Sequence, residues 1–479
     1  MNVHWHRRDL RASDNRALAE AARGDGSVLP VFVFDPEILA HASPPRVAVM
    51  LDALESLRAD YRELGGDLLV VRGDPREEVP RIAESYDADA VYWNRDYSGL
   101  ARERDNEVRL ALDDAGVSRA AYHDALHHEP GSIRTNKGEH YSVYTYFWKK
   151  WRDREKDAPY DAPEEGEIAT PADAPDLPGT TALPSLADLG FDEPEADVPP
   201  AGTGVARGRL ADFREEAIFR YAEDRDYPAR DATSRLSPHL KWGTIGIREV
   251  WWATEEAMDR ADGDPDEEGT EAASVREFQS QLAWREFYAH VLSARPDVVT
   301  RNYKSYENDI DWREDEEALR AWRQGKTGYP IVDAAMRQLR EEAYMHNRLR
   351  MVVASFLTKD LLLDWREGYD WFREKLADHD TGNDTGGWQW AASTGTDAQP
   401  YFRVFNPMTQ GERYDPDCEF VEEYVPELEA ASPDDIHGWH ELSDAERERI
   451  APDYPAPIVD HSERREEAIA MFEAARGDD

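Results

Sequence analysis

The chain is poor in cysteine, in lysine and in long apolar runs. Cys418 is the only cysteine in 479 residues, which excludes an internal disulfide and a cysteine-rich metal site. No apolar run approaches the roughly 18 residues that cross a bilayer, and residues 1–10 lack the apolar stretch of an export signal. We therefore expect a cytoplasmic protein that is not attached to a membrane.

Basic residues are few beside acidic ones: 57 against 101, for a net charge of −44, and only nine of the 57 are lysine. Phosphate attraction normally supplies much of the affinity for nucleic acid, so this balance at first disfavours such a partner. Self-repulsion of this kind is also associated with solubility in concentrated salt, where the Debye length falls to about 3 Å. We interpret the charge as the adaptation of a halophile-like protein, in which local arginine clusters still act at contact distance.

The two halves of the chain have different periodicities. Near the N-terminus, short β-branched or aromatic runs alternate with helical spacing, which predicts an α/β fold with a doubly wound parallel sheet over residues 1–125. The predicted strands are residues 1–6, 28–34, 67–71 and 90–93, and residues 47–64 are a predicted helix. Over residues 204–479, apolar side chains recur at helical spacing, as in 331–339 and 349–357, which predicts an all-α region.

Between these regions we expect an interdomain linker, residues 126–203. Residues 159–200 contain nine prolines and no periodicity. Because proline fixes φ and removes an N–H donor, this stretch predicts an extended connector. Within the helical region, the acidic residues 262–269 predict a surface loop, and residues 462–476 predict one final helix.

Residues 233–238, Thr-Ser-Arg-Leu-Ser-Pro, combine three hydroxyls with a guanidinium. Hydroxyls donate to phosphate oxygens and arginine binds phosphate in a bidentate manner, so the segment is a candidate phosphate site. Ser237 before Pro238 also predicts the N-cap of a helix, and helix N-termini favour anions. Taken alone, a simple cap is the preferred interpretation.

Trp388 and Trp390 stand two residues apart and cannot share one helix face, so one can line a pocket while the other packs inward. Asp378 and Asp380 precede them, in a predicted loop that includes the glycines of residues 382–387. Carboxylates in this position can accept hydrogen bonds from a cofactor, or can form an Asx-rich turn before a helix.

Two further segments, residues 284–288 and 401–403, interleave arginine with aromatic rings. This pattern suits a stacked base with phosphates held beside it, although a helix with buried aromatics explains each segment alone. Residues 325–330 superficially suggest a phosphate-binding loop. That assignment is rejected, because no glycine stands five residues before Gly325.

Taken together, these segments closely resemble the DNA photolyase/cryptochrome family, and within it the class I cyclobutane-pyrimidine-dimer photolyases. The resemblance keeps the family order and spans nearly the whole chain, with weak matches only in the linker and in residues 262–269. The matching segments are residues 6–11, 233–238, 284–288, 325–337, 345–348, 364–368 and 386–407.

The resemblance implies an N-terminal antenna domain and a C-terminal helical domain that holds FAD in a U shape. It also implies light-driven electron transfer from reduced FAD to a dimer that is flipped out of ultraviolet-damaged DNA. We expect no metal site, no obligate protein partner and a monomer.

The resemblance assigns roles by position. The residues implied to hold the FAD phosphates are Tyr221, Thr233, Ser234, Arg235, Leu236 and Ser237. Those implied on the flavin and ribose side are Asn347, Asp378, Asp380 and Asp384. Those implied around the lesion are Gln281, Trp284, Asn347, Met351 and Trp390, and those along the DNA strand are Arg225, Arg285, Arg348, Arg403 and Gln410. The implied electron-transfer chain is Trp388, Trp365 and Trp312.

Two positions depart from the family pattern. Gln281 stands where class I photolyases usually carry a glutamate that hydrogen-bonds the dimer, so we expect binding to survive and stabilisation of the dimer radical anion to weaken. Asp384, four residues before Trp388, stands where photolyases usually place an asparagine facing flavin N5 and plant cryptochromes an aspartate. Asn383 could also take this place. A protonated Asp384 could donate a proton to a flavin radical, which favours a sensory role.

Family members that bind a folate commonly carry polar residues where this chain has Leu100-Ala101. A second chromophore is therefore expected to be 8-hydroxy-5-deazaflavin rather than methenyltetrahydrofolate, with an empty site as the alternative. Cryptochromes often carry a long C-terminal extension; we expect none here, because the sequence ends soon after the predicted final helix. Residues 345–348 fit the dimer class rather than the (6-4) photolyases. We predict a dimer photolyase, with a cryptochrome-like blue-light photoreceptor as the alternative.

Overall fold

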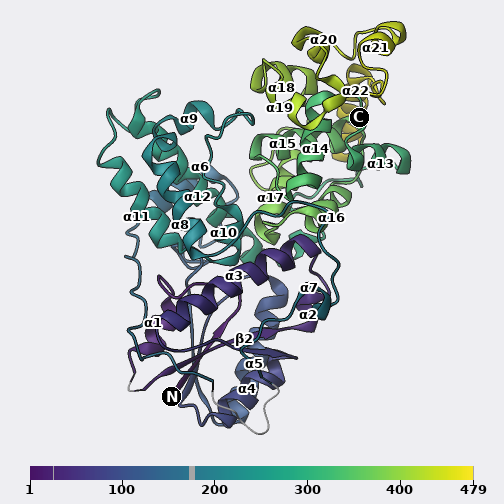
Figure 1. The fold of residues 1–479 in the computed structure, drawn as a ribbon. Helices are drawn as coiled ribbons and strands as arrows, with labels where there is room; N and C mark the ends of the chain where they lie inside the picture. The colour runs from purple at the N-terminus through teal and green to yellow at the C-terminus, as the bar shows by residue number, and fades with distance from the viewer. Residues whose placement is uncertain (25, 172–178, 478–479) are drawn as a thin grey trace.

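Five parallel strands form the sheet of the N-terminal region (Figure 1). The computed structural model describes residues 1–24, 26–171 and 179–477. The strands are β1 (Asn2–His6), β2 (Val28–Phe34), β3 (Leu69–Arg72), β4 (Ala90–Asn94) and β5 (Ser118–Tyr122), in the order β3-β2-β1-β4-β5. The four predicted strands are confirmed. The sequence did not predict β5, because Ser-Arg-Ala-Ala-Tyr has little β propensity and forms an edge strand by pairing with β4.

Helices cover both faces of this sheet, which confirms the doubly wound prediction. Phe32 and Phe34 of β2 pack on one face with α1 (Arg16–Ala22) and α3 (Pro44–Glu63). Leu29 and Val31 pack on the other face with α4 (Pro75–Ser85) and α5 (Gly99–Asp114). Burial on both faces explains why β2 is a continuous apolar run.

The predicted linker, residues 126–203, is only partly extended. Its first part forms α6 (Tyr144–Arg152), in which Tyr144, Phe147 and Trp151 lie in a core of the helical region. These three side chains share one helical face, a signal that the proline-rich composition further along obscured. Later in the linker, Ile168 is buried and pairs with Val28 of the sheet. The domain boundaries at residues 125 and 203 stay a prediction.

Two short helices complete this region, α2 (Pro36–Leu39) and α7 (Leu186–Leu189). The second is a helical turn inside the stretch predicted to be extended, 159–200. Residues 172–178 of that stretch lie outside the described residues.

The helical region consists of two groups of helices, each with its own core (Figure 1). The first group contains α6, α8 (Thr203–Glu215), α9 (Tyr221–Asp224), α10 (Ser237–Trp242), α11 (Ile247–Met258) and α12 (Glu271–Ala294). The second contains α13 (Glu316–Gln324), α14 (Pro330–Glu342), α15 (Asn347–Ser355), α16 (Trp365–Lys375), α17 (Thr381–Ala391), α18 (Pro407–Tyr414), α19 (Glu419–Tyr424), α20 (Pro433–His437), α21 (Asp444–Ile450) and α22 (His461–Arg476). The all-α prediction is confirmed, as are the loop at 262–269 and the final helix.

Residues 382–387 are helical, so the prediction of a glycine-rich loop was wrong. α17 begins after Asp380, whose carboxylate accepts a hydrogen bond from the backbone N–H of Asn383 at 3.2 Å. Gly386 is explained by packing, because a Cβ there would lie 2.2 Å from the ring of Tyr288 on α12. The glycines therefore allow close contact between two helices.

A buried cluster of four charges joins the N-terminal region to the helical region. Arg248 of α11 donates from Nη2 to Oδ1 of Asp124 and from Nε to Oδ1 of Asp14, both at 2.5 Å. Arg11 donates to the other oxygen of Asp124, also at 2.5 Å. All four side chains are buried, and each charge has a partner of opposite sign, which is what makes burial of charge sustainable.

Lys359 lies in a short π-helix, Phe356–Asp360, that follows α15; it is fully buried, and its titration makes the stability pH-dependent. Burial, with a contribution from Lys304, lowers the pKa of Lys359 from 10.5 to about 7. Between these two values the unfolded chain binds a proton that the folded chain does not, so stability rises with pH by about 1.4 kcal/mol per pH unit. We expect Lys359→Met to remove this part of the slope.

The measurement is the free energy of unfolding at pH 7.5 and pH 9.5, in wild type and in Lys359→Met. Other buried lysines titrate in both proteins, so the difference between the two slopes isolates Lys359. Lys326→Met, at an exposed position, is the control and should keep the wild-type slope. Equal slopes in wild type and Lys359→Met would contradict the prediction.

Candidate functional site

A cavity of about 470 Å³ lies between the two groups of helices. Its walls come from the segment before α10, from α12, and from α15 and α17. It brings together most of the residues that the sequence singled out. Those that line it are Tyr221, Arg225, Thr233, Ser234, Arg235, Leu236, Ser237, Gln281, Trp284, Arg285, Asn347, Met351, Asp378, Asp380, Asp384, Trp388 and Trp390. Trp312, Trp365, Arg348, Arg403 and Gln410 lie outside its lining.

The candidate phosphate segment forms one edge of this cavity. Arg235 has a left-handed backbone (φ 46°) and Leu236 a right-handed one. Successive residues of opposite hand turn their N–H groups toward the same side, an anion-binding arrangement. The predicted N-cap at Ser237 was wrong: the N-cap is Leu236, and α10 has six residues and no side-chain cap. Backbone N–H groups and hydroxyls, rather than a helix terminus, therefore form the candidate phosphate site.

Two aspartates precede α17: Asp378 is buried and Asp380 is half-buried. Asp378 accepts a hydrogen bond from Arg350 at 2.7 Å through Oδ2, while its Oδ1 is buried without a hydrogen-bond partner among the described residues. Asp380 accepts one from Arg8 at 2.7 Å. Burial raises the pKa of Asp380, but Arg8, Lys241 and nearby charge hold it well below its usual range. The Asp380 carboxylate therefore stays ionised at neutral pH.

Both candidates for the position facing the flavin, Asn383 and Asp384, line the cavity. Asp384 is buried and accepts a hydrogen bond from the backbone N–H of Asp380 at 3.0 Å. Asn383 donates through its side chain to Asp380 at 2.9 Å. Asn383 is thus held by Asp380, while Asp384 is held by the Asp380 N–H and lies beside His379 and Arg350. Which of the two faces the flavin stays a prediction.

An aromatic wall lies opposite the carboxylates. Trp284 on α12 and Trp390 on α17 both line the cavity, together with Met351. The ring of Trp284 is stacked on that of Tyr144 from α6, with centroids 3.7 Å apart and planes 10° apart. The Tyr144 hydroxyl donates to the Ser280 carbonyl at 2.6 Å. One face of Trp284 is thus held by Tyr144, and a base can stack only on the other.

Tyr144→Leu should weaken binding of dimer-containing DNA by about 3- to 10-fold, because an aromatic pair contributes about 0.5–1.5 kcal/mol beyond area burial and its loss frees the Trp284 ring. Fluorescence anisotropy with a thymine-dimer oligonucleotide measures the change. Tyr144→Phe keeps the ring and loses only the hydroxyl, so its affinity should stay within about twofold of wild type. Equal losses in both variants would show that stacking is not the cause.

Gln281 has a partner within its own helix. Its amide donates to the carboxylate of Glu277 at 2.9 Å, and Glu277 also pairs with Arg225. Burial raises the pKa of Glu277 above its ordinary value, and the opposing effect of Arg225 offsets only part of that rise. The carbonyl of Gln281 is the acceptor left for a ligand, since its amide is engaged.

The three tryptophans of the predicted electron-transfer chain share one core. Trp388 lines the cavity and is buried, Trp365 is fully buried, and Trp312 is half-exposed against Phe472. Gly368, one turn after Trp365 on α16, allows α16 to pack closely against the Trp388 ring, because a Cβ there would lie 2.0 Å from that ring. A buried ring at the cavity and a half-exposed ring at the surface suit an electron path between the two. The electron-transfer role of the three tryptophans stays a prediction.

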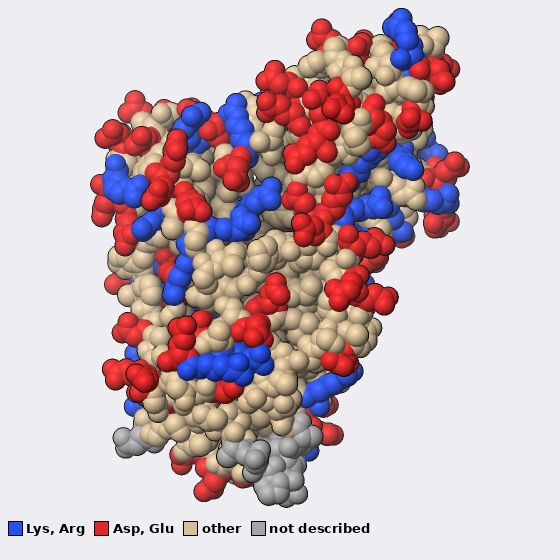
Figure 2. All heavy atoms as spheres, viewed as in Figure 1, with Lys and Arg blue, Asp and Glu red and all other residues tan. Residues whose placement is uncertain are grey.

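The predicted DNA-contacting arginines differ in how far they are engaged within the protein. Arg348 pairs with Asp226 at 2.5 Å, and Arg285 donates to the carbonyls of Ala125 and Leu240 at 2.8 and 3.1 Å. Arg403 is exposed on the surface. Figure 2 shows acidic side chains over much of the molecule and a band of Lys and Arg across the junction of the two helix groups. The DNA contacts stay a prediction, and Arg403 is the side chain best placed for one.

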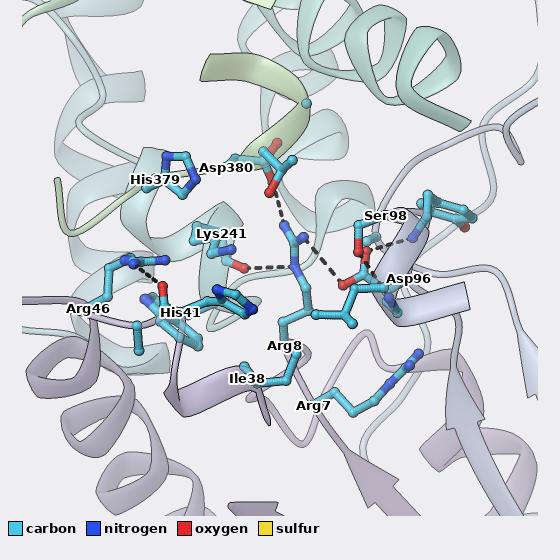
Figure 3. Close-up of a pocket in the computed structure, with 18 of the residues that line it drawn as sticks. Arg7, Arg8, Ile38, His41, Arg46, Asp96, Ser98, Lys241, His379 and Asp380 are labelled. Carbon is cyan, nitrogen blue, oxygen red and sulfur yellow. Dashed lines mark hydrogen bonds and ion pairs between the residues drawn. The ribbon is translucent and has the colours of Figure 1, made fainter. Parts of the chain in front are cut away.

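A second cavity, of about 480 Å³, lies where the carboxyl ends of β1, β2 and β4 face the helical region (Figure 3). Arg8, just after β1, projects into it, ion-paired to Asp380 at 2.7 Å and to Asp96 at 3.6 Å. Burial raises the pKa of Asp96, but Arg8, Arg7 and Lys241 together outweigh it and lower the pKa to about 2. The two cavities share four lining residues, Lys241, Arg285, Asp380 and Asn383.

Several lining residues were not predicted from sequence. Arg350, the partner of Asp378, stands three residues after Asn347, so helical spacing could have placed it on the same face. Lys241 gave no local signal, because most of the charged residues around it are more than 100 positions away in the chain. Tyr144 supports Trp284 from behind the lining, and its helical-face signal was obscured by the proline-rich composition of the linker.

One cluster in the described part of the chain has metal-ligand spacing: His4, His6 and Asp9. Hydrogen bonds already occupy most of its polar atoms. His6 bonds to the Asp9 carbonyl and the Tyr61 hydroxyl, at 3.0 and 2.6 Å, and Asp9 accepts from Asn94 at 2.6 Å. We interpret this cluster as a buried polar network, and the absence of a metal stays a prediction.

No helix among the described residues is long and apolar enough to cross a bilayer.

Two family models cover most of the chain: DNA photolyase at residues 2–165, and the FAD binding domain of DNA photolyase at residues 278–474. A deoxyribodipyrimidine photo-lyase of Halobacterium salinarum is 63% identical over the full length of both chains, in line with the salt-adapted composition. A class III photolyase structure from Agrobacterium tumefaciens has a TM-score of 0.90 at 36% identity, covering 99% of this chain and 98% of its own. An archaeal photolyase from Sulfolobus tokodaii, solved with two FAD molecules, has a TM-score of 0.83 at 32% identity, covering 99% and 100%. The chain belongs to the DNA photolyase family.

Proposed function

We propose that this protein is a deoxyribodipyrimidine photo-lyase, which uses light to split cyclobutane pyrimidine dimers in DNA. The observation that carries the proposal is a single cavity that combines a phosphate-binding segment, buried carboxylates and the Trp284–Trp390 pair. The Halobacterium relative bears that name at 63% identity over the whole chain. Ultraviolet-damaged DNA is the proposed partner, and the predicted monomer and cytoplasmic location are part of this proposal.

The residues of the cavity fit FAD. The unpartnered Oδ1 of Asp378 is a buried acceptor that calls for a donor. A Cβ at Gly387 would meet nothing within 4 Å, so the wall is open there for a flat ring. Thr233, Ser234 and Arg235 would hold the phosphates, and Asp378 and Asp384 would face the flavin side. The chemistry that FAD supplies when bound is transfer of one electron to the dimer after light absorption, and its recovery after the ring opens.

The side chains of the chain hold and orient the dimer. Trp284 and Trp390 offer aromatic faces for a flipped-out base, and the lost stacking of a damaged base lowers the cost of extruding it. Gln281 offers a carbonyl acceptor, and the apolar wall excludes water. No nucleophile is required of the protein in this scheme.

The deciding experiment uses purified, reduced protein and ultraviolet-damaged thymine oligomers at high salt. Under blue light the dimers should disappear, and in darkness they should remain. Equal loss in light and darkness, or no loss in either, would overturn the proposed function.

Gln281→Glu should change the quantum yield of repair by a modest factor, about two- to threefold. The new carboxylate would stand one helical turn from Glu277, and the added charge alters the field at the lesion. Dimer loss per absorbed photon measures the effect, with Glu268→Gln in the exposed acidic loop as a control for charge. An unchanged yield would make the position irrelevant to repair.

We propose the second cavity as the site of the antenna chromophore. Leu100 and Ala101 line it together with other apolar side chains such as Trp5 and Met50, which supports 8-hydroxy-5-deazaflavin over methenyltetrahydrofolate. The Sulfolobus relative, described with two FAD molecules and a novel light-harvesting cofactor, makes a second FAD another outcome. Extraction and mass analysis of the bound chromophores would distinguish these, and release of FAD alone at one per chain would favour an empty site.

A cryptochrome-like photoreceptor is the alternative, and Asp384 in the cavity is the observation that favours it. Its test is a comparison of wild type with Asp384→Asn, which should differ in the protonation of light-reduced flavin if the sensory interpretation holds. Repair is preferred, because the relative that is 63% identical is named for repair.

A further inference from the structure

One pair of side chains connects the two cavities. Asp384 lines the flavin cavity and His379 lines the second cavity. Nδ1 of His379 lies 2.6 Å from Oδ2 of Asp384, and both side chains are more than nine-tenths buried. The two atoms are close but not aligned as a hydrogen bond, so the ring must turn for its N–H to point at the carboxylate. Figure 3 shows the His379 ring at the edge of the second cavity, near Asp380 and Lys241. The sequence analysis singled out Asp384 but gave His379 no role.

We propose that His379 and Asp384 form a relay that carries one proton from the second cavity into the flavin cavity. This proposal rests on the proposed function, because the need for the proton comes from FAD. Oxidised FAD becomes the reduced anion by taking up two electrons and one proton. The tryptophan chain can bring electrons, refilled by an external thiol, and the buried Asp384 in the cavity wall offers a route for the proton.

The Nδ1–H bond of His379 breaks and an O–H bond forms at Oδ2 of Asp384; that proton then leaves toward the flavin cavity, which restores the carboxylate. Water at the second cavity gives a proton to Nε2, and the hydroxide left behind is neutralised by buffer. His379 ends neutral, one proton has crossed, and the pair itself exchanges no electrons. A neutral imidazole suits this task because it carries one donor and one acceptor nitrogen.

The surrounding charges support these protonation states. Burial, together with Arg46 and Lys241, lowers the pKa of His379, and Asp384 opposes that shift. His379 is therefore neutral at neutral pH. The Tyr369 ring packs against His379 with centroids 5.4 Å apart.

On the other side of the pair, Asp384 faces two groups. Nη1 of Arg350 lies 3.7 Å from its Oδ1, and the backbone N–H of Asp380 donates to its Oδ2 at 3.0 Å. Both stabilise the carboxylate after each transfer. Cations and donors thus approach the pair from α3, α10, α15 and the start of α17.

The test follows proton uptake and flavin absorbance together during illumination of the FAD-loaded protein without DNA, with a thiol and a pH-indicator dye. Oxidation of two thiols to a disulfide releases two protons per two electrons, so in wild type the dye should record a net release of one proton, one fewer than the thiols supply. The uptake by the protein should be slower in D₂O. His379→Gln and Asp384→Asn should slow the uptake on the order of 100-fold, the range for loss of a positioned acid or base. Imidazole added to His379→Gly should restore part of the rate, which a merely structural role would not produce.

His440→Gln, at a half-exposed histidine paired with Glu441, is the matched control and should behave as wild type. Uptake at the wild-type rate in His379→Gln would overturn the relay. If a variant loses FAD, the relay is tested on the wild-type protein alone. Equal rates of proton uptake in H₂O and D₂O would then overturn the relay. Light-driven repair by chemically pre-reduced wild type is measured in parallel: its absence refutes the proposed function, whereas intact repair with unchanged uptake in His379→Gln refutes only the relay.

Discussion

Replacing Asp124 by alanine should lower the free energy of unfolding by about 3–5 kcal/mol, since removal of one partner leaves buried charges uncompensated. Asp124 binds Arg11 and Arg248 at 2.5 Å each and accepts the backbone N–H of Arg16 at 3.0 Å. With Asp124 gone, Arg11 loses its carboxylate and Arg248 keeps only Asp14. Because Arg248 belongs to the helical region, the loss should also loosen the junction between the two regions.

Denaturant unfolding at fixed high salt measures this effect. Asp113→Ala, which breaks an exposed pair with Arg119, is the control and should cost less than about 1 kcal/mol. A similar small loss for Asp124→Ala would show that the buried cluster contributes little.

The Asp124 contribution also has a defined pH dependence. Burial raises the pKa of Asp124, but Arg11 and Arg248 outweigh it and hold the pKa below 3.8. For an acid with a lowered pKa in the folded state, the stabilisation is present above the unfolded pKa and is lost as the pH falls below 3.8. The difference between wild type and Asp124→Ala should therefore be constant from pH 5 to pH 7 and shrink in more acidic solution.

Trp284→Ala should weaken binding of dimer-containing DNA by about 10- to 100-fold, because stacking of a base on an aromatic side chain contributes about 1–3 kcal/mol. Trp284 is the ring that Tyr144 holds against the cavity, so its loss removes the surface on which the flipped-out base would stack. Affinity for undamaged duplex should change little, since that binding rests on phosphate contacts.

Anisotropy titrations with damaged and undamaged oligonucleotides at one salt concentration measure both quantities. Trp252→Ala, at an exposed tryptophan on α11, is matched in residue type and should leave both affinities unchanged. An equal loss for damaged and undamaged DNA in Trp284→Ala would indicate that the ring does not contact the lesion.

Sequence patterns predicted secondary structure correctly where the residues of a single helix or strand are enough to determine it. The run Val28–Phe34 predicted β2, and the apolar spacing of residues 331–339 predicted α14, because each pattern reports which faces are buried. The predictions failed where contacts with another segment of the chain determine the structure. Gly386 looked like part of a loop and instead lies in α17, since its lack of a side chain admits the Tyr288 ring. β5 forms because it pairs with β4. α6 is stabilised because its aromatic side chains pack into a core built from later segments of the chain.

The candidate site shows the same division. The sequence by itself determined the chemical groups available: hydroxyls and an arginine at residues 233–237, aspartates before Trp388, and two tryptophans for stacking. Only the tertiary structure decided which of these share a cavity, because α12 and α17, about 100 residues apart, must first pack together. It also placed His379 against Asp384 between two cavities and engaged Arg285 within the protein. Composition records which groups are present, whereas distances, burial and pKa values arise from packing between segments far apart in the chain.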